Sequence, residues 1–226
     1  MIGRLHVLTD FLFQQAHGHG ALARMAVAGG ADVVQFRQKR GTARDVWANL
    51  VPVVAACREG GATVLVDDDL GLAVASGADG VHLGQTDLPV SAARLALDAL
   101  PLVSGDGMAS GAGGGPARGR IVGATATTAQ QARAAEAAGA DYVGFGPVFA
   151  TGSKANPARV KGLAGLAEAC AAVSVPVIAI AGITPERVAG CLDAGAHGVA
   201  VMTAVSCAAD PRGATAAFRE AIERWG

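Results

Sequence analysis

The stretch GADYV at residues 139–143 has three near-copies in the chain, and this repeated phrase decides the fold. The other copies are GADVV at 30–34, GADGV at 77–81 and GAHGV at 195–199. Each copy follows an alanine-rich stretch and opens a short apolar run. A glycine at this place is typical of a helix C-terminus, where the chain turns through a left-handed conformation. The apolar run predicts a buried parallel strand.

Further apolar runs lie between the copies, so we expect eight strands in all. The additional runs begin at Leu5, Thr63, Ile121 and Pro176. Helical patterns separate the strands, at residues 21–28, 43–58, 70–76, 91–100, 129–138, 163–173, 185–194 and 211–225. This alternation predicts a single α/β domain over residues 1–226, a (β/α)8 or TIM barrel with a parallel eight-stranded core. The main alternative is a doubly wound dinucleotide-binding sheet, which requires Gly-x-Gly-x-x-Gly after the first strand, and this chain lacks it there.

Composition narrows the class of protein. The 226 residues are 51% hydrophobic and 16% charged, which can fill a sizeable core and argues against disorder. The formal net charge of -1 gives no field that would attract nucleic acid or an anionic membrane. No apolar stretch is long enough to span a bilayer, and the N-terminus does not resemble a signal peptide. A homo-oligomer is compatible with the sequence, which does not itself give the oligomeric state.

The cysteines indicate the compartment. Cys57, Cys170, Cys191 and Cys207 include no Cys-x-x-Cys pair, and we expect them to be buried free thiols. Free thiols fit a reducing, cytoplasmic location.

One segment interrupts the alternation. Residues 104–119 are rich in Gly, with Ser, Ala and Pro, and have no apolar period, which predicts a flexible loop. This loop joins a helix to the next strand and therefore falls on the N-terminal face of the barrel. Active sites of such barrels use the opposite face, so we expect no catalytic role for it.

Polar residues follow the expected strands, and the carboxyl ends of barrel strands meet at one mouth. Gln35, Arg37 and Lys39 stand at alternate positions and share a face if the second strand extends through Lys39. The other polar or conformationally special residues at strand ends are Asp67, Asp68, Asp69, His82, Gln85, Asp87, Thr125, Thr151, Gly152, Ser153, Lys154, Gly182, Ile183, Met202 and Thr203.

The charges in this set suggest a phosphorylated ligand. Arg37, Lys39 and Lys154 suit a phosphate group with two or more negative charges. Carboxylates beside these cations would repel such a ligand unless a divalent metal lies between them. Asp68 and Asp87 are the hard oxygen ligands that Mg2+ prefers.

A second anion site is expected on the far side of the mouth. Gly182 precedes a helix and leaves backbone N–H groups open, and Thr203 lies beside another possible helix start. A diphosphate with Mg2+ and a separate phosphate together imply two phosphorylated small-molecule substrates.

Each signal also has an ordinary structural interpretation. One of the acids at 67–69 can simply cap the helix from Leu70, and the strand end at 35–39 can simply enter solvent. His82 on a buried strand is more often a satisfied core histidine than a ligand. His17 and His19 have metal-like spacing, yet we expect a plain loop there. The shared location of the polar residues at one mouth is what favours function.

Taken in order, these motifs resemble thiamine phosphate synthase. The matching residues are QFRQK at 35–39, Asp68, HLGQTD at 82–87, GFGPVF at 144–149 with Thr151, Ser153 and Lys154, and GIT at 182–184. The resemblance extends from about Leu5 to Pro211, apart from the loop at 104–119. It implies the (β/α)8 barrel and a transferase of thiamine biosynthesis. That enzyme joins hydroxymethylpyrimidine diphosphate to the thiazole phosphate and releases diphosphate.

The resemblance also implies a role for each residue. Asp68 and Asp87 would bind Mg2+. The residues for the pyrimidine diphosphate would be Gln35, Phe36, Arg37, Gln38, Lys39, Asp67, Thr125 and Lys154. Those for the thiazole phosphate would be Thr151, Gly152, Ser153, Gly182, Met202 and Thr203. Arg37, Lys39, Lys154 and Thr125 would be catalytic, since the family's diphosphate leaves first and the thiazole nitrogen traps the pyrimidine cation.

The chain departs from the family pattern at three places. Asp67 replaces the usual Asn, Thr127 stands where the family has His, and Ala181 replaces the first glycine of Gly-Gly-Ile. One alternative is the related thiazole tautomerase, which is expected to use a histidine at the place of Thr127 and often lacks an acid at that of Asp87. Another is a non-catalytic phosphate-ligand-binding barrel, which the intact cations and acids disfavour and Asp67 leaves open.

Overall fold

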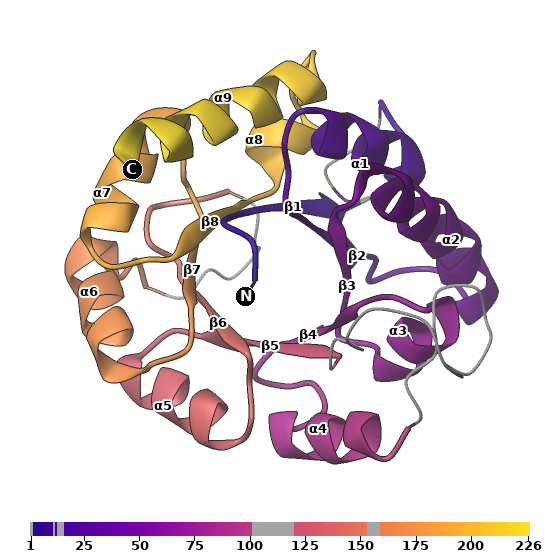
Figure 1. Cartoon of the computed structure of the whole chain (residues 1–226), viewed down its shortest axis with the longest axis horizontal. Helices are drawn as coiled ribbons and strands as arrows, with labels where there is room; N and C mark the ends of the chain where they lie inside the picture. Colours follow the sequence, from indigo (N-terminus) through magenta and orange to yellow (C-terminus); the bar gives the residue numbers. More distant parts are fainter. Residues whose placement is uncertain (1, 11, 13–15, 101–119, 153–158) are drawn as a thin grey trace, which may run out of the picture.

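A computed structural model describes residues 2–10, 12, 16–100, 120–152 and 159–226. Eight parallel strands form a closed barrel in chain order, and β8 pairs with β1 (Figure 1). The strands are β1 Leu5–Asp10, β2 Val33–Arg37, β3 Thr63–Asp67, β4 Gly80–Leu83, β5 Ile121–Ala126, β6 Tyr142–Phe145, β7 Val177–Ile180 and β8 Gly198–Val201. This closed parallel sheet confirms the predicted single (β/α)8 TIM barrel and excludes the open sheet. The predicted loop at 104–119 lies outside the described residues.

The helices surround the barrel, and their ends differ from the predicted ends by at most two residues. They are α1 His19–Ala28, α2 Ala43–Gly60, α3 Leu70–Ser76, α4 Val90–Asp98, α5 Ala129–Ala137, α6 Gly162–Ala172, α7 Pro185–Asp193, α8 Thr203–Ser206 and α9 Pro211–Trp225. The short helix α8, directly after β8, was not among the eight predicted helices, although a possible helix start was expected beside Thr203. No helix in the described ranges is long and apolar enough to cross a membrane.

The repeated Gly-Ala phrase acts as expected at its first position. Its four glycines, Gly30, Gly77, Gly139 and Gly195, have φ angles of +95°, +68°, +94° and +94°. This left-handed conformation favours glycine, because a side chain would be strained there. The repeat therefore turns the chain from each helix into the next even-numbered strand.

The acid in the repeat has a structural function that the sequence analysis did not identify. Asp32 Oδ2 accepts hydrogen bonds from the backbone N–H of Arg4 and of Leu5, each 2.8 Å long. Asp79 Oδ2 accepts in the same way from Val64, and Asp141 Oδ2 from Val122. Each acid thus ties the start of its own strand to the start of the preceding strand.

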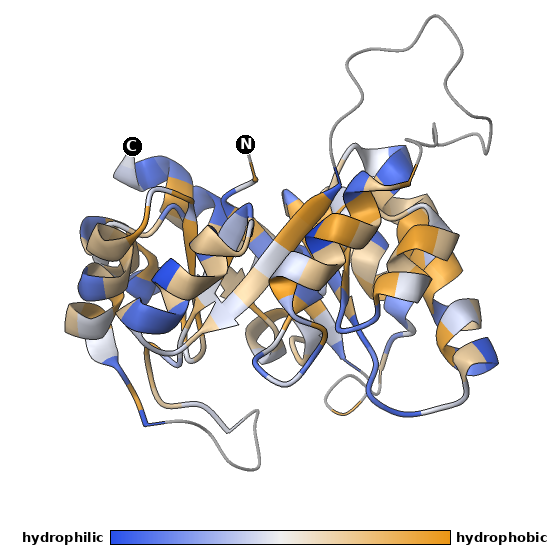
Figure 2. Cartoon of the chain, turned by 90° about the horizontal axis from the view of Figure 1, so that it is seen from below, coloured by the Kyte–Doolittle hydropathy of each residue, from blue (hydrophilic) through white to orange (hydrophobic). Residues whose placement is uncertain are grey.

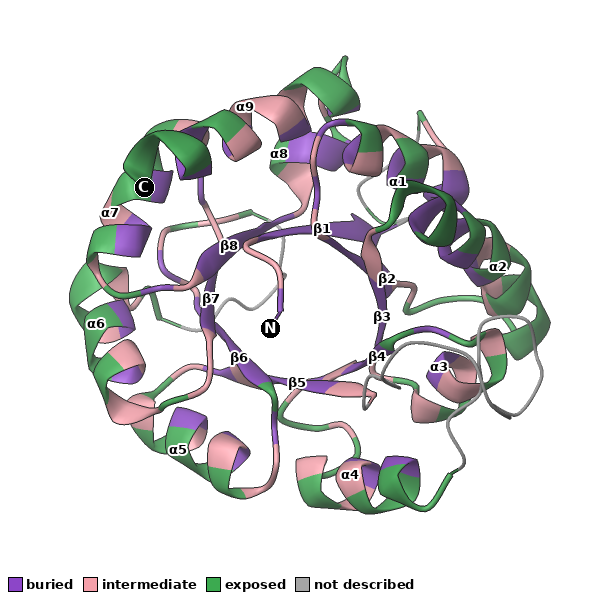
Figure 3. Cartoon of the chain, in the orientation of Figure 1, coloured by how far each residue is buried: buried purple, intermediate pink, exposed green. Residues whose placement is uncertain are grey.

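The core has an inner and an outer part. Apolar residues of the strands and helices form two large buried clusters. Buried residues lie on the strands and on the helix turns that face them, while exposed residues lie on the outer helical turns and the loops (Figure 3). Hydrophobic and hydrophilic residues are interspersed along the helices (Figure 2). A smaller apolar cluster, which includes Leu8, Leu65 and Ile178, lies inside the barrel. All four cysteines are free thiols, as predicted. Cys57 and Cys191 are buried, whereas Cys170 is only half-buried and Cys207, which follows the short helix α8, is exposed, so the prediction of burial was wrong for Cys207 and only partly met by Cys170.

Candidate active site

The first two strands end in a charged pair. Asp10 and Arg37 are partners in the parallel register of β1 and β2, and Arg37 Nη1 donates a hydrogen bond to Asp10 Oδ2. Asp10 is only 1% exposed, and its other oxygen accepts from the N–H of Leu12 at 2.9 Å. Because a buried carboxylate fixes its guanidinium, Arg37 has a defined position at the mouth. The sequence analysis did not identify Asp10. A signal was present, because one strand ends in an acid and the neighbouring strand ends in an arginine.

Lys39 does not reach the mouth as part of the strand. β2 ends at Arg37, two residues before Lys39, so the condition under which Gln35, Arg37 and Lys39 would share a strand face is not met. Lys39 Nζ instead forms an ion pair with Asp68 Oδ2, from the turn after the neighbouring strand β3. The ammonium group of Lys39 is therefore oriented by this ion pair and not by its position on a strand.

Asp68 lies at the apex of a tight turn. The N–H of Asp69 bonds the C=O of Asp67 at 2.8 Å, and Asp68 between them has a φ of +69°. This is the geometry of a γ-turn, a strained conformation for a residue with a side chain. Asp69 caps α3 through a 2.9 Å bond from the N–H of Leu72, which confirms that one of the three acids is a helix cap. The turn therefore separates Asp69, which caps the helix, from Asp68, whose carboxylate lies at the mouth beside Lys39.

Asp68 and Asp87 face each other. Burial raises the pKa of Asp68, and the hydrogen bond with Asp87 adds to the rise, against the lowering effect of Lys39. Burial also raises the pKa of Asp87, which is less buried, but its hydrogen bonds with Asp68 and with the Gly84 N–H, the latter 2.7 Å long, outweigh this and lower its pKa overall. The carboxyl groups of Asp68 and Asp87 thus lie next to each other, beside the ammonium group of Lys39. A bound metal cation would relieve the repulsion between the two carboxylates.

The pair fits Mg2+ in its chemistry. Mg2+ is commonly bound in proteins by one or two carboxylates, with water and phosphate oxygens as the other ligands. Over the described part of the chain, no group of three or more His, Cys, Asp or Glu side chains could hold a metal. Asp68 and Asp87 would therefore supply two oxygen ligands, and a phosphorylated substrate and water the remainder.

The carboxyl group of Asp67 is buried near Asp68 and Asp87. Its Oδ1 is buried and accepts no hydrogen bond from any described residue. Burial raises the pKa of Asp67 well above its ordinary value, and the charge of Asp68 acts in the same direction. An acid at this place is thus held in an environment that favours its neutral form.

Two further predicted residues lie inside the barrel. Gln35 is 3% exposed, and its Nε2 contacts His6 Nδ1 at 2.9 Å. Thr125 Oγ1 contacts His82 Nε2 at 3.0 Å, and His82 Nδ1 contacts the hydroxyl of Tyr142 at 2.8 Å. Both ring nitrogens of His82 have partners, so the expectation of a satisfied core histidine is confirmed.

Two other predicted residues have side chains with structural contacts. Phe36 is 1% exposed and packs between the sheet and the helices, with its ring 4.7 Å from that of His19. Its side chain is therefore part of the core, and only its backbone could contact a ligand. Gln38 donates to the C=O of Arg40 at 2.8 Å and accepts from Asn49 at 3.1 Å. Both bonds shape the turn after β2.

The turn after β2 borders a cavity. This cavity has a volume of about 160 Å3 and is lined by Asp10, Leu12, Gln38, Lys39 and Arg40. Its cations make it suitable for an anionic group.

The opposite side of the mouth is built from backbone. The N–H of Val148 bonds the C=O of Ile180 at 3.0 Å, and the N–H of Phe149 bonds the C=O of Ala181 at 3.1 Å. The loop after β6 therefore lies along the turn after β7. A Cβ on Gly182 would come within 2.4 Å of the Ala150 oxygen, so only glycine fits there.

The turn after β7 has two consecutive left-handed residues. Ala181 has a φ of +83° and Gly182 a φ of +65°. The N–H groups of Gly182 and Ile183, just before α7, donate no hydrogen bond to another described residue. Such open N–H groups ahead of a helix suit an anion.

The other residues predicted for the thiazole phosphate are placed only in part. Thr151 and Gly152 follow the segment paired with β7, Met202 directly precedes α8, and Thr203 is the first residue of α8. Ser153 and Lys154 lie outside the described residues. The structure thus brings Thr151, Gly152 and Gly182 to one side of the mouth.

Thr127 has a local function. Its N–H and its hydroxyl both donate to Gln131 Oε1, at 2.7 and 2.9 Å. Thr128 accepts from the N–H of Gln131 at 3.2 Å and caps α5. The side chain at the place of the family's histidine is therefore engaged at the start of a helix.

The family model and the most similar known proteins identify one family. A family model described as thiamine monophosphate synthase matches residues 11–104 and 115–205. The chain is 50% identical to the thiamine-phosphate synthase of Salinibacter ruber over 222 residues, which covers 98% of this chain and 89% of that protein. It is 42% identical to the thiamine-phosphate synthase of Methanoculleus marisnigri, with coverage of 96% and 94%. A solved structure of thiamine phosphate pyrophosphorylase from Pyrococcus furiosus superposes with a TM-score of 0.82 at 33% identity, covering 98% and 96% of the two chains.

Proposed function

The chain belongs to the thiamine monophosphate synthase family, and on that premise we propose how its barrel mouth performs the reaction. The protein is a transferase that joins an aminopyrimidine carrying a methylene diphosphate to a thiazole phosphate. The bond between the methylene carbon and the diphosphate oxygen breaks, and its electron pair leaves with the diphosphate. The lone pair of the thiazole nitrogen then forms a carbon–nitrogen bond to the same methylene carbon, which gives thiamine phosphate.

The observation that carries this proposal is the apposition of Asp68 and Asp87 beside Lys39. We assign the leaving diphosphate to this side of the mouth, with Arg37 held by Asp10 as a further cation. Mg2+ would be held by the two carboxylates and would compensate the charge that develops on the leaving diphosphate. Lys39 would then be released from Asp68 to the diphosphate.

We place the aminopyrimidine over the inner residues and the thiazole phosphate on the backbone side. Gln35 and Thr125 offer amide and hydroxyl groups to a heterocycle. The open N–H groups of Gly182 and Ile183 suit the phosphate of the thiazole, with Thr151 and Gly152 close in sequence to the paired loop. This arrangement would put the thiazole nitrogen and the methylene carbon between the two anion sites, where proximity accelerates their reaction.

The structure disfavours the tautomerase alternative. The residue at the place of that family's histidine is Thr127, and both its N–H and its hydroxyl are bonded to Gln131. A proton-transfer reaction at that place would lack its base. We also expect a cytoplasmic location, which the four free thiols support.

A turnover assay tests the proposed function. Purified protein is incubated with both substrates and Mg2+, and thiamine phosphate and diphosphate are measured. We expect both products in equal amounts, and loss of both when Mg2+ is chelated. A protein that binds both substrates and forms neither product would be a non-catalytic binder and would overturn the proposal.

A further inference from the structure

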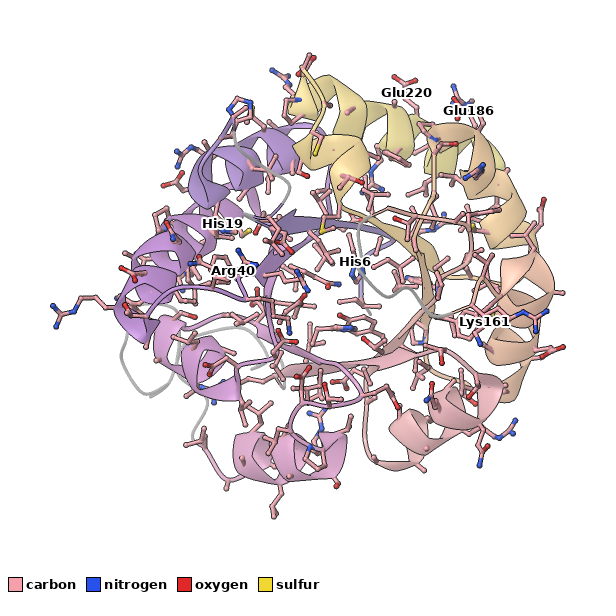
Figure 4. All side chains as sticks on the ribbon, turned by 180° about the vertical axis from the view of Figure 1, so that it is seen from behind. His6, His19, Arg40, Lys161, Glu186 and Glu220 are labelled. Carbon is pink, nitrogen blue, oxygen red and sulfur yellow. The ribbon has the colours of Figure 1, made fainter. Side chains whose placement is uncertain are left out.

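Five polar side chains from five strands form one continuous hydrogen-bonded chain inside the barrel. Its members are His6, Gln35, Tyr142, His82 and Thr125. From the bottom, His6 Nε2 contacts the C=O of Gly3 at 3.1 Å, and His6 Nδ1 contacts Gln35 Nε2 at 2.9 Å. Gln35 Nε2 also donates to the hydroxyl of Tyr142 at 3.3 Å. The bonds from Tyr142 to His82 and from His82 to Thr125 complete the chain, and Figure 4 shows His6 within the ring of strands.

The direction of every bond in this chain follows from its lower end. The C=O of Gly3 can only accept, so His6 carries its proton on Nε2 and must accept at Nδ1. Gln35 Nε2 donates its two protons to His6 and to Tyr142. The Tyr142 hydroxyl accepts from Gln35, and because His82 Nδ1 is the only acceptor that contacts it among the described residues, it donates its proton to His82 Nδ1. His82 consequently carries its proton on Nε2 and donates it to the hydroxyl oxygen of Thr125.

The reverse orientation of the Gln35 amide is unfavourable. With its oxygen toward His6, the His6 proton would have to lie on Nδ1. A bare Nε2 would then face the Gly3 oxygen, so two buried acceptors would be in contact. Burial lowers the pKa of His6 to about 3 and that of His82 to about 4, so neither ring carries a second proton that could remove this constraint at neutral pH.

The fixed direction leaves one donor and one acceptor for a ligand. The hydroxyl proton of Thr125 is not used within the chain, because Thr125 accepts from His82. The carbonyl oxygen of the Gln35 amide accepts no hydrogen bond from another described residue. An aminopyrimidine offers the complementary groups, an exocyclic N–H donor and ring-nitrogen acceptors. With the exocyclic group at the Gln35 oxygen and the ring nitrogen at Thr125, the amino form pairs at both places. A 4-oxopyrimidine in the same position sets two acceptors against each other at Gln35 and two donors against each other at Thr125.

We propose that Tyr142, acting through His82 on Thr125, is a positioning residue that sets the preference of the site for a 4-aminopyrimidine over a 4-oxopyrimidine. The proposal deepens the proposed function and rests on the assignment of the pyrimidine to Gln35 and Thr125. Tyr142 is fully buried, so it acts through its neighbours and not by contact with the substrate. Its hydroxyl accepts a hydrogen bond from Gln35 and donates one to His82, and in this way it fixes which nitrogen of His82 carries the proton that faces Thr125.

The barrel is shaped to hold this tyrosine. Gly123 lies between His82 and Tyr142 in the register of β4, β5 and β6. A Cβ on Gly123 would approach the Tyr142 ring to 2.3 Å, and one on Gly144 would approach the His82 ring to 3.1 Å. The two rings are stacked with centroids 5.4 Å apart. The absence of side chains at the two glycines therefore provides the space in which the rings meet.

The first test is the binding preference of the variant Tyr142→Phe, which removes only the hydroxyl. Calorimetric titration would use the 4-amino and 4-oxo forms of the pyrimidine methyl monophosphate, so no turnover is needed. We expect wild-type protein to prefer the amino form and Tyr142→Phe to reduce the ratio of the two affinities about tenfold. The control Ile121→Val changes the packing of a partly buried residue at the interior cluster and should leave the ratio unchanged. A loss of affinity that is equal for both ligands in Tyr142→Phe would show a merely structural tyrosine and overturn the proposal.

The second test is independent of any ligand. Nitrogen-15 NMR of the histidine rings should show His6 and His82 as neutral rings protonated at Nε2 in the wild type. In Tyr142→Phe, His82 should lose this fixed tautomer while His6 keeps it. A wild-type His82 protonated at Nδ1 would overturn the assigned direction. If the turnover assay fails while both of these results hold, the proposed function is wrong and the positioning chain stands.

Discussion

The two sides of the barrel mouth are built from different materials. The side formed by β1 to β4 presents charged side chains in close pairs, Arg37 with Asp10 and Lys39 with Asp68. The side formed by β6 and β7 presents backbone held by its conformation, with Ala181 and Gly182 in the left-handed region. The first side should respond to removal of charge, and the second to addition of a single Cβ. Substitutions can therefore separate the two sides by substrate as well as by size of effect.

The largest effect is expected for Asp87→Asn on the charged side. Loss of one of the two carboxylates that we assign to Mg2+ and the leaving diphosphate should lower kcat/KM by about 100-fold or more and weaken its dependence on Mg2+. Steady-state kinetics over a range of Mg2+ concentrations measures this effect. The exposed acid Asp98, on α4, provides the control Asp98→Asn, which should behave as wild type. Unchanged Mg2+ dependence in Asp87→Asn would remove Asp87 from the metal site.

The next effect concerns Lys39. The variant Lys39→Met should raise the KM for the pyrimidine diphosphate about tenfold or more, because a charge-assisted contact to a phosphate oxygen is lost. The KM for the thiazole phosphate should stay within about twofold of wild type if the two sides act separately. Arg44→Met, at an exposed position in the first turn of α2, serves as a control for loss of a nearby positive charge. An equal rise in both KM values would contradict the division of the mouth.

Gly182→Ala reverses that pattern. The added Cβ would meet the Ala150 oxygen at 2.4 Å, so the turn must move and its N–H groups with it. We expect a rise of about tenfold in the KM for the thiazole phosphate alone, as a hydrogen-bonded anion site loses its alignment. Gly61→Ala is a matched control, since Gly61 has a similar φ of +73° and open space at its Cβ. Equal kinetics for the two variants would show that backbone strain, and not the phosphate seat, is the cause.

Asp67→Asn tests the acid on the charged side at which the chain departs from its family. The pKa of Asp67 is raised in the folded protein, so the fold binds this proton more tightly than the unfolded chain does. Stability from this group is therefore present at acidic pH and is lost as pH rises above the unfolded value toward the folded pKa. Without Mg2+, Asp67→Asn should raise Tm at pH 8 by a few degrees, with about 2–4 °C expected for each kcal/mol, and by less at pH 4. Thermal melts at both pH values measure this, and a pH-independent shift would show that Asp67 does not titrate in this range.

The smallest effect is expected for Ala181→Gly on the backbone side. Relief of the left-handed strain at Ala181, about 1–2 kcal/mol, is partly offset by the extra chain entropy of glycine, about 0.4–1 kcal/mol. A net gain of about 0 to 1.6 kcal/mol in the free energy of unfolding should follow and can be measured by urea titration. Ala194→Gly, at a φ of -73°, should destabilise the protein instead. Destabilisation by both would show that Ala181 is not strained.

The sequence predicted the fold and the charged side better than the backbone side. The Gly-Ala repeat fixes helix ends and strand starts locally, and the strand-end charges at Arg37, Asp68 and Asp87 can be read one by one. Asp10 escaped because its function exists only through its partner across β1 and β2. The positive φ of Ala181 could not be read from an alanine, because it is imposed by the contacts with the loop after β6. A backbone conformation that tertiary contacts impose cannot be predicted from the residue types at that position.

The interior chain falls between these two cases. His82 was correctly expected to be a satisfied core histidine, since a ring on a buried strand needs partners. Its partner Tyr142 belongs to the same repeat that marks the strands, and nothing in the order of residues distinguishes it from an ordinary core aromatic. The connection from Gly3 to Thr125 crosses five strands and became visible only in three dimensions.

The division of the mouth is tested most directly by calorimetric titration of the two anions with and without Mg2+. Inorganic diphosphate and the thiazole phosphate are each titrated into the same metal-free protein, and the titrations are repeated with Mg2+ present. We predict that Mg2+ strengthens diphosphate binding at least about tenfold and leaves thiazole phosphate binding within about twofold. Equal dependence of both ligands on Mg2+, or none for diphosphate, would contradict a charged metal-binding side opposed to a backbone side.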